Sequence, residues 1–292
     1  MDPGRLYHRG AFSVAWRQQA GGLIWRIVPD HEGGLIGEVR DPTARGVSFF
    51  RVVVSSGEVV WNNATAPGGW WTGIECVARG VLLLHGFASP DLPGHRGLTA
   101  LDLRTGAALW HEDDAVFVAA AGGVAYALRG RPERRELVGR DLLNGTVVSA
   151  DSAEEGRLRD LVTRWQGEAP PSPLFPEPVD AGTEEHALAG RLLAGALMTE
   201  GGVEMLRTDG VVITVHHDPV PAARGSRQAF RRVLSVFSGE APAPAAAYRE
   251  ILDESVPVPV PDAFLVVNST LLFVKDRRTL CAVHLSGRER KT

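Results

Sequence analysis

Residue types that bind ligands or move protons gather in the first half of the chain. The stretch HGFASPDLPGHRG, residues 85–97, carries two imidazoles and a carboxylate, and a Trp-Trp pair and a glutamate precede it. Imidazole and carboxylate groups bind metals and exchange protons, and indole rings contact apolar or cationic groups. With two further aspartates, the candidate ligand-binding residues are Trp70, Trp71, Glu75, His85, Asp91, His95, Asp114 and Asp262.

The same residues also have a purely structural interpretation. Residues 85–97 are expected to be a loop between two strands. Pro90, Pro93 and Gly94 mark a folded turn in it, in which Asp91 hydrogen-bonds to the backbone. The two tryptophans fill a gap between neighbouring structural units in this interpretation. The sequence leaves both interpretations open and assigns no catalytic residue.

A second histidine cluster, His216-His217-Asp218, does not predict a metal site. Adjacent residues of a strand point to opposite faces, so at most one histidine shares a side with Asp218. No H-E-x-x-H pattern accompanies the cluster, and we expect no metal and a strand end at the surface. The chain also lacks the G-x-S-x-G, P-loop and G-x-G-x-x-G motifs of hydrolases, NTPases and dinucleotide-binding proteins.

The composition excludes several function classes. The 292 residues include 31 Lys and Arg against 35 Asp and Glu, so the net charge is −4 and gives no general attraction for nucleic acid or anionic lipid. The two cysteines, Cys76 and Cys281, form no framework for disulfides or zinc. The N-terminal residues lack the apolar stretch of a signal peptide and no apolar run is long enough to span a membrane, so we expect a cytoplasmic protein.

An internal repeat places these residues in a fold. Apolar-polar alternation interrupted by a turn glycine recurs at Gly57, Gly106, Gly145, Gly239 and Gly287. Three of the four separations are about 40–50 residues, the period of a four-stranded propeller blade, and the fourth is about twice that. The sequence therefore predicts an all-β, five-bladed β-propeller as a single domain over residues 1–292. Its blades are expected at about residues 23–61, 74–110, 115–150, 203–254 and 263–287.

Two segments fall outside this repeat. The last blade lacks a strand, and the apolar segment AFSVAW, residues 11–16, has no other partner, so we expect it to pair with residues 279–285, close the propeller and bury Trp16. Residues 151–202 form a helical and Pro-rich insertion between blades three and four. Its first helix is expected to pack through Leu158, Leu161 and Trp165, and the following Pro-rich link to have no regular structure.

The segment Ala100–Trp110, ALDLRTGAALW, fits the A-x-D-x-x-T-G-x-x-x-W tryptophan-docking repeat of quinoprotein-type propellers at every specified position. In the first copy of this repeat, Gly57 and Trp61 occupy the Gly and Trp positions, but Arg51 stands where the repeat has Ala. More closely, three stretches resemble an uncharacterised bacterial domain-of-unknown-function family with a quinoprotein-like propeller. They are LIWRIVPD with EVRD, WWTGIE with LLLHGFASPDLPGHRGLTALDLRTGAALW, and PVPDAFLVVNSTLLFVKDRRTLCAVHL.

This resemblance implies a fold and no activity. Quinoprotein dehydrogenases stack pyrroloquinoline quinone on a disulfide between adjacent cysteines, which this chain cannot form, so we expect no cofactor, neither the quinone nor haem. The leading hypothesis is a non-enzymatic scaffold, acting as a monomer, whose partner is a protein or a small-molecule ligand and not nucleic acid or a membrane. The alternative is a glycosidase-like hydrolase that uses carboxylates such as Glu75, Asp114 and Asp262.

Overall fold

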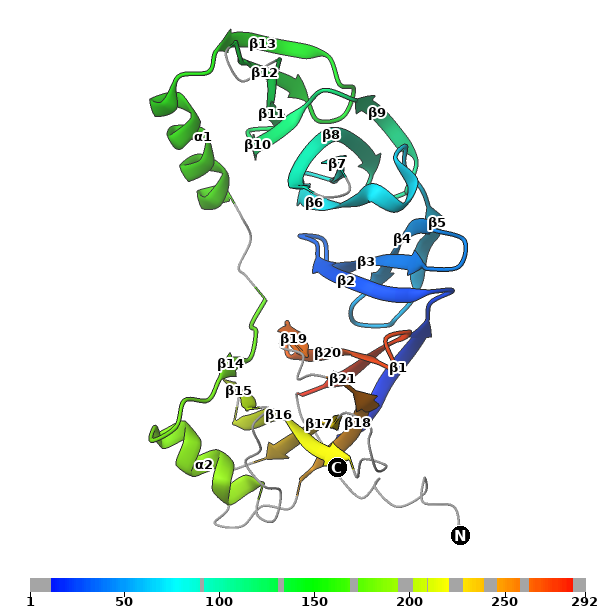
Figure 1. The fold of residues 1–292 in the computed structure, drawn as a ribbon, viewed down its shortest axis with the longest axis vertical. Coiled ribbons are helices and arrows are strands. Elements are labelled where there is room, and N and C mark those ends of the chain that lie inside the picture. Colours follow the sequence, from blue (N-terminus) through cyan, green and yellow to red (C-terminus); the bar gives the residue numbers. More distant parts are fainter. Residues whose placement is uncertain are drawn as a thin grey trace, which may run out of the picture. The chain divides into compact units, whose positions relative to one another are not determined.

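Five antiparallel sheets make up the protein (Figure 1). The computed structural model describes residues 12–89, 92–130, 134–168, 173–193, 202–208, 210–220, 228–238, 246–257 and 263–285. In four of the sheets, four strands follow one another in the order of a propeller blade. The expected all-β, five-bladed fold is confirmed.

The first three blades follow the repeat directly. Blade one contains β2 (Leu23–Pro29), β3 (Gly34–Asp41), β4 (Gly46–Val53) and β5 (Val59–Ala64). Blade two contains β6 (Thr72–Ala78), β7 (Val81–Ser89), β8 (Leu92–Asp102) and β9 (Ala108–Glu112). Blade three contains β10 (Val116–Ala121), β11 (Val124–Arg129), β12 (Glu136–Asp141) and β13 (Val147–Ser152).

Blade four gains a fifth strand. It contains β15 (Val203–Thr208), β16 (Val211–Val220), β17 (Ala229–Ser238) and β18 (Tyr248–Val256), with the two-residue β14 (Glu177–Pro178) added at the edge. The Pro-rich link was expected to have no regular structure, and this part of the prediction is wrong. Proline is tolerated there because an edge strand needs ladder bonds on one side only.

The fifth blade joins the two ends of the chain. It contains β19 (Phe264–Val267), β20 (Thr270–Lys275), β21 (Thr279–His284) and the N-terminal β1 (Val14–Gln19). β1 pairs antiparallel with β21, and Trp16 lies opposite Ala282. The expected pairing is thus confirmed for the described residues. Trp16 is half-buried rather than buried, because among the described strands none pairs with the other side of β1.

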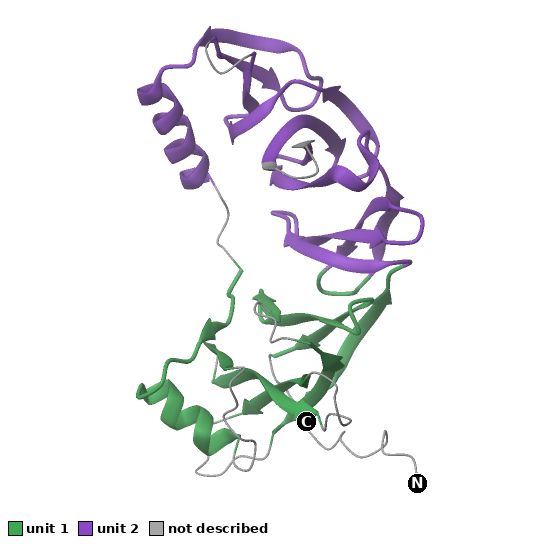
Figure 2. Ribbon diagram, viewed as in Figure 1, with its two compact units in different colours: residues 1–20, 54–57, 173–292 green, residues 21–53, 58–172 purple. Residues whose placement is uncertain are grey.

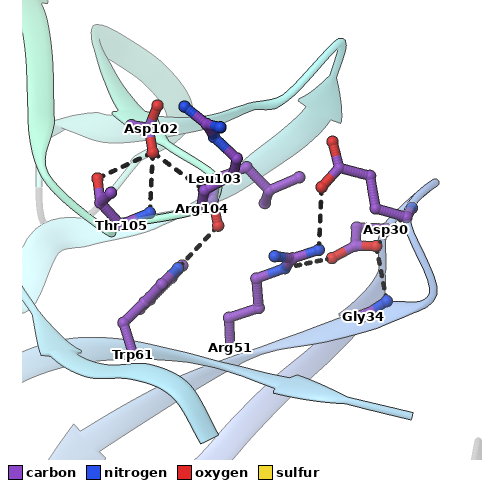
Figure 3. A network of polar contacts seen from close by, with 9 residues as sticks. Asp30, Gly34, Arg51, Trp61, Asp102, Leu103, Arg104 and Thr105 are labelled. Carbon is purple, nitrogen blue, oxygen red and sulfur yellow. Dashed lines mark hydrogen bonds and ion pairs between the residues drawn. The ribbon is translucent and has the colours of Figure 1, made fainter. Parts of the chain in front are cut away.

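The tryptophan at the end of a strand docks on the hairpin of another blade. The indole N–H of Trp61 donates to the carbonyl of Leu103 (2.8 Å) (Figure 3). In the same way, the indole N–H of Trp110 donates to the carbonyl of Leu142 (2.8 Å). A Cβ atom on Gly106 would lie 2.9 Å from the Trp61 ring, and this glycine has a φ of 72°. Only glycine combines this left-handed backbone with so close an approach.

An aspartate shapes the same hairpin. One carboxylate oxygen of Asp102 accepts hydrogen bonds from the backbone N–H groups of Arg104 and Thr105 and from the Thr105 hydroxyl (Figure 3). Partial desolvation raises the pKa of Asp102, but the bonds from Thr105 and Arg104 outweigh it and leave this pKa below its ordinary value. The Asp and Gly positions of the repeat therefore fix the turn on which the indole ring lies.

Arg51 stands at the Ala place of the repeat in blade one. It is buried, and its guanidinium donates to the buried carboxylate of Asp30 (2.7 Å) (Figure 3). Asp30 also accepts from the N–H of Gly34 and so closes the hairpin between β2 and β3. The departure from the repeat is compensated, because the buried charge has a partner and a fixed geometry.

Both predicted helices of the insertion are present, as α1 (Glu155–Glu168) and α2 (Glu184–Leu192). Trp165 of α1 meets Phe117 of β10 edge to face, with ring centroids 5.2 Å apart. Glu168 accepts from the N–H of Gly122 (2.8 Å). Trp165 and Glu168 thus connect the C-terminal half of α1 to blade three, and Leu158 and Leu161 are half-buried.

His216 and His217 are buried, which corrects the expected surface strand end. β16 continues to Val220, so both histidines lie within the paired part of the strand, opposite Val233 and Arg232 of β17. His216 and Asp218 share a side, with Nε2 and Oδ1 3.4 Å apart. Burial lowers the pKa of His216, although Asp218 acts in the opposite direction.

The chain divides into two compact units (Figure 2). One contains residues 1–20, 54–57 and 173–292, and the other contains residues 21–53 and 58–172. Each has its own core: Val215, Leu234 and Phe273 lie in the first, and Phe49, Leu84 and Leu101 in the second. Among the described residues, none of the helices is both long and apolar enough to cross a membrane.

Candidate functional site

Three strands of blade two bring a carboxylate and two imidazoles together. Glu75 lies on β6, His85 on β7 and His95 on β8. The stretch of residues 85–97 was expected to be a loop, but β7 continues to Ser89 and β8 begins at Leu92. Both strands extend past the regular part of the blade, where Phe87 pairs with His95 and Ser89 pairs with Leu92. The histidines therefore lie on paired strands of the second blade.

Irregularities in the pairing of β6, β7 and β8 set the directions of the Glu75, His85 and His95 side chains. The register of β6 against β7 shifts between Ile74 and Cys76, which makes Glu75 the extra residue of a bulge. A second shift separates His85 from Phe87 on β7. A bulge re-aims a side chain and is common beside functional sites. Glu75 reaches the two histidines because it is not held in the regular alternation of β6.

One oxygen of Glu75 contacts both histidines. Its Oε2 lies 2.9 Å from Nδ1 of His95 and 3.1 Å from Nδ1 of His85. Burial raises the pKa of Glu75, but the hydrogen bonds and positive charge of His85 and His95 outweigh it, and the net pKa is lowered. Glu75 is therefore held as a carboxylate.

The two imidazole rings are stacked, with centroids 3.5 Å apart and planes 8° from parallel. Their exposure differs: the His85 side chain is 7% exposed and that of His95 is 39% exposed. The Nδ1 of His85 is buried, and its 3.1 Å contact with Glu75 is poorly aligned for a hydrogen bond. His85 also lies so close to β6 that a Cβ on Gly73 would be 2.9 Å from its Nε2. The site thus has one fixed imidazole and one accessible imidazole.

Phe87 forms an aromatic wall beside the histidines. Its ring meets His85 and His95 edge to face, with centroid distances of 5.1 and 5.5 Å. Trp71 meets Phe87 in the same way at 6.4 Å. Of the predicted tryptophans, Trp71 therefore reaches the cluster through Phe87. We define the histidine cluster as Glu75, His85, His95, Phe87 and Trp71.

Trp70 contacts Arg40. The Arg40 guanidinium lies 5.2 Å from the Trp70 ring and 5.3 Å from the Trp25 ring, distances typical of cation–π contacts. Arg40 also donates to the carbonyls of Trp70 (2.8 Å) and Thr72 (3.1 Å). It therefore fixes the short 3-10 helix Gly69–Trp71, from which β6 begins.

The remaining predicted residues lie apart from the cluster or outside the described residues. Asp114 is exposed and pairs with Arg96, whose Nε donates to it (3.1 Å). Asp91 and Asp262 lie outside the described residues. The sequence did not single out Phe87 or Arg40, although Phe87 is two residues from His85, a spacing that places both on one face of a strand.

The cysteines lie outside the histidine cluster. Cys76 and Cys281 are free thiols, half-buried and buried respectively, and they belong to different compact units. Burial raises the pKa of the Cys281 thiol to about 11 and that of Cys76 further. Both thiols therefore stay protonated near neutral pH and are poor nucleophiles.

Residues 28–110 match the sequence model of a family described as "Domain of unknown function (DUF4905)". The resemblance to an uncharacterised family is thus confirmed over less than a third of the chain, a part that includes the whole histidine cluster. A search of curated proteins finds no match.

Several solved structures are similar at low identity. BamB from Moraxella catarrhalis is 11% identical with a TM-score of 0.24, over 93% of this chain and 88% of that chain. The Dos1 propeller is 9% identical with a TM-score of 0.32, over 90% of this chain and 67% of that chain. The quinohemoprotein alcohol dehydrogenase ADHIIG from Pseudomonas putida HK5 is 10% identical with a TM-score of 0.28, over 92% of this chain and 40% of that chain.

Proposed function

We propose that this propeller is a non-enzymatic binding protein that takes a small ligand at the histidine cluster of blade two. The observation that carries the proposal is the shared Oε2 of Glu75, which lies within 3.1 Å of two imidazoles from neighbouring strands. Such a cluster presents hydrogen-bonding and charged groups next to an aromatic wall, a combination that is typical of small-molecule sites.

The energetic cost of the arrangement supports this proposal. A buried polar atom whose contact is poorly aligned is stabilised less than one with a well-aligned hydrogen bond, and Nδ1 of His85 is such an atom. Gly73 also has to leave space for the His85 ring. A blade built for packing alone gains nothing from these features, whereas a ligand that bonds to Nδ1 would recover the cost.

The hydrolase alternative is less well supported. A glycosidase needs a protonated carboxylic acid, whose pKa is raised, and a second carboxylate that faces the substrate. The pKa of Glu75 is shifted in the opposite direction by its histidines, and Asp114 pairs with Arg96. Asp262 lies outside the described residues, so the argument against hydrolysis rests on Glu75 and Asp114.

A ligand screen by thermal unfolding tests the proposal. A compound that binds only the folded protein raises its melting temperature by mass action. The screen would contain organic acids, amines, sugars, nucleosides and, in separate wells, divalent metal ions. We expect at least one hit with the wild-type protein, a strongly reduced shift in His95→Ala and an unchanged shift in His111→Ala.

His111 is the matched control because it is also a partly exposed imidazole of blade two. Its ring contacts Thr99 (2.8 Å) and Asp113 (2.8 Å), neither of which belongs to the cluster. A screen without any hit, or hits that persist in His95→Ala, would contradict the proposed function.

A further inference from the structure

The histidine cluster has the donor atoms of a transition-metal site. One ligand atom each from Glu75, His85 and His95 all lie within 4.8 Å of one another. We propose that these three residues bind one divalent transition-metal ion, of the kind represented by Zn²⁺ and Co²⁺. This inference rests on the proposed function, since it names the chemical class of ligand for the same site.

The donor set selects the class of ion. Two imidazole nitrogens and one carboxylate suit zinc and its neighbours in the first transition row, whereas Ca²⁺ and Mg²⁺ prefer oxygen ligands. Zinc takes nitrogen and oxygen ligands at about 2.0–2.2 Å and is usually four-coordinate. Three protein ligands would leave at least one position for water or for a small organic ligand.

The Nδ1 atoms of His85 and His95 are placed so that both can bind the same ion as Glu75. Both Nδ1 atoms face the same oxygen of Glu75, at 2.9 and 3.1 Å. Ligand atoms about 3 Å apart are close to the separation that two ligands of one tetrahedral ion require. The His85 Nδ1, which is buried without an aligned hydrogen bond, would gain a strong bond to the ion.

The stacked rings require one adjustment. A metal lies near the plane of an imidazole that binds it, and two planes 3.5 Å apart and 8° from parallel do not meet at one ion. One ring must therefore turn. The His95 side chain is 39% exposed and can rotate, whereas His85 is held against Gly73 and Phe87. We expect His85 and Glu75 to keep their places and His95 to turn onto the ion.

The compact unit of residues 1–20, 54–57 and 173–292 offers a contrast. His216, His217 and Asp218 also lie together, but the two histidines point to opposite faces of β16. His217 lies opposite Arg232, whose positive charge opposes a cation there. Among the described residues, Glu75, His85 and His95 form the one group of three or more such donors that lies close enough to share an ion.

Metal titration tests the inference. The full chain, without a histidine tag, would be stripped with a chelator, dialysed at pH 7.5 and titrated with Zn²⁺ by calorimetry and with Co²⁺ by visible absorption. We expect one ion per chain, at least tenfold weaker binding in His95→Ala and in Glu75→Gln, and binding within twofold of wild type in His111→Ala. Millimolar Mg²⁺ should not compete.

Unfolding curves of the metal-free variants would be recorded first, so that only folded protein is titrated. Undetectable binding to the wild-type protein, or equal binding by wild type and His95→Ala, would overturn the inference. Equal losses in His95→Ala and His111→Ala would also overturn it, since the ion would then not lie at the cluster. If an organic compound still shifts the melting temperature in a His95-dependent way, the metal inference fails and the proposed function stands.

Discussion

The pairing of tryptophan and glycine explains how a few residues specify three of the blade hairpins. Trp16, Trp61 and Trp110 each donate their indole N–H to a backbone carbonyl, at 2.8 Å in all three cases. Each ring also lies on a turn glycine with φ near 72°, namely Gly57, Gly106 or Gly145. Because both partners are required, the pattern could be recognised in the sequence from residue types and spacing alone.

Replacing Gly106 with alanine tests this docking. We expect Gly106→Ala to lower the free energy of unfolding by more than the about 1–2 kcal/mol of left-handed strain, because the new Cβ would lie 2.9 Å from the Trp61 ring. The matched control is Gly33→Ala: its φ is 80°, but nothing lies within 4 Å of its Cβ position. Urea unfolding measures both variants, and equal losses would show that the Trp61 contact is not required.

The candidate site was predictable from residues only in part. Histidines and tryptophans carry a signal because their side chains bind ligands, and the sequence therefore singled out Glu75, His85 and His95. Phe87 and Arg40 carry no such signal, since phenylalanine is an ordinary core residue and arginine an ordinary surface one. Their roles depend on which strand faces them, which the sequence alone does not reveal.

At the level of elements, the repeat predicted the hairpins but not the irregularities that build the site. The segment of residues 85–97 contains Pro90, Pro93 and Gly94, which are typical of a loop. The strands nevertheless continue, since β9 pairs with β8 only from Leu98 on, and the preceding part of β8 is an edge where proline is tolerated. A bulge such as that at Glu75 depends on the pairing register, which residue propensities do not determine.

The N-terminal strand provides a test at this scale. We expect deletion of residues 1–17 to leave a strongly destabilised or aggregating protein, because β21 would lose most of its pairing with β1 and expose backbone donors and acceptors on that side. The deletion would also remove the bond from Trp16 to Val54. The melting temperature measures the effect, with the exposed Leu143→Ala as a control that should melt near wild type. A truncated chain that melts at the wild-type temperature would contradict the role of β1.

At the level of the whole molecule, the histidine cluster lies within a single compact unit. Its residues all belong to the unit of residues 21–53 and 58–172, and they also lie within the DUF4905 match of residues 28–110. The site is therefore complete within one part of the chain. Fold and site follow from different features: the fold from the glycine and tryptophan repeat, and the site from a bulge and an extended hairpin in one blade.

Anomalous X-ray diffraction at the zinc edge, from crystals of the full chain grown with Zn²⁺, tests most directly whether the histidine cluster is a ligand site. We predict a strong anomalous peak between the side chains of Glu75, His85 and His95, at about 2.0–2.2 Å from a donor atom of each. The His95 ring would be turned out of its stacked position. Crystals in which Zn²⁺ occupies other surface positions while the cluster carries no peak would contradict the assignment of this site.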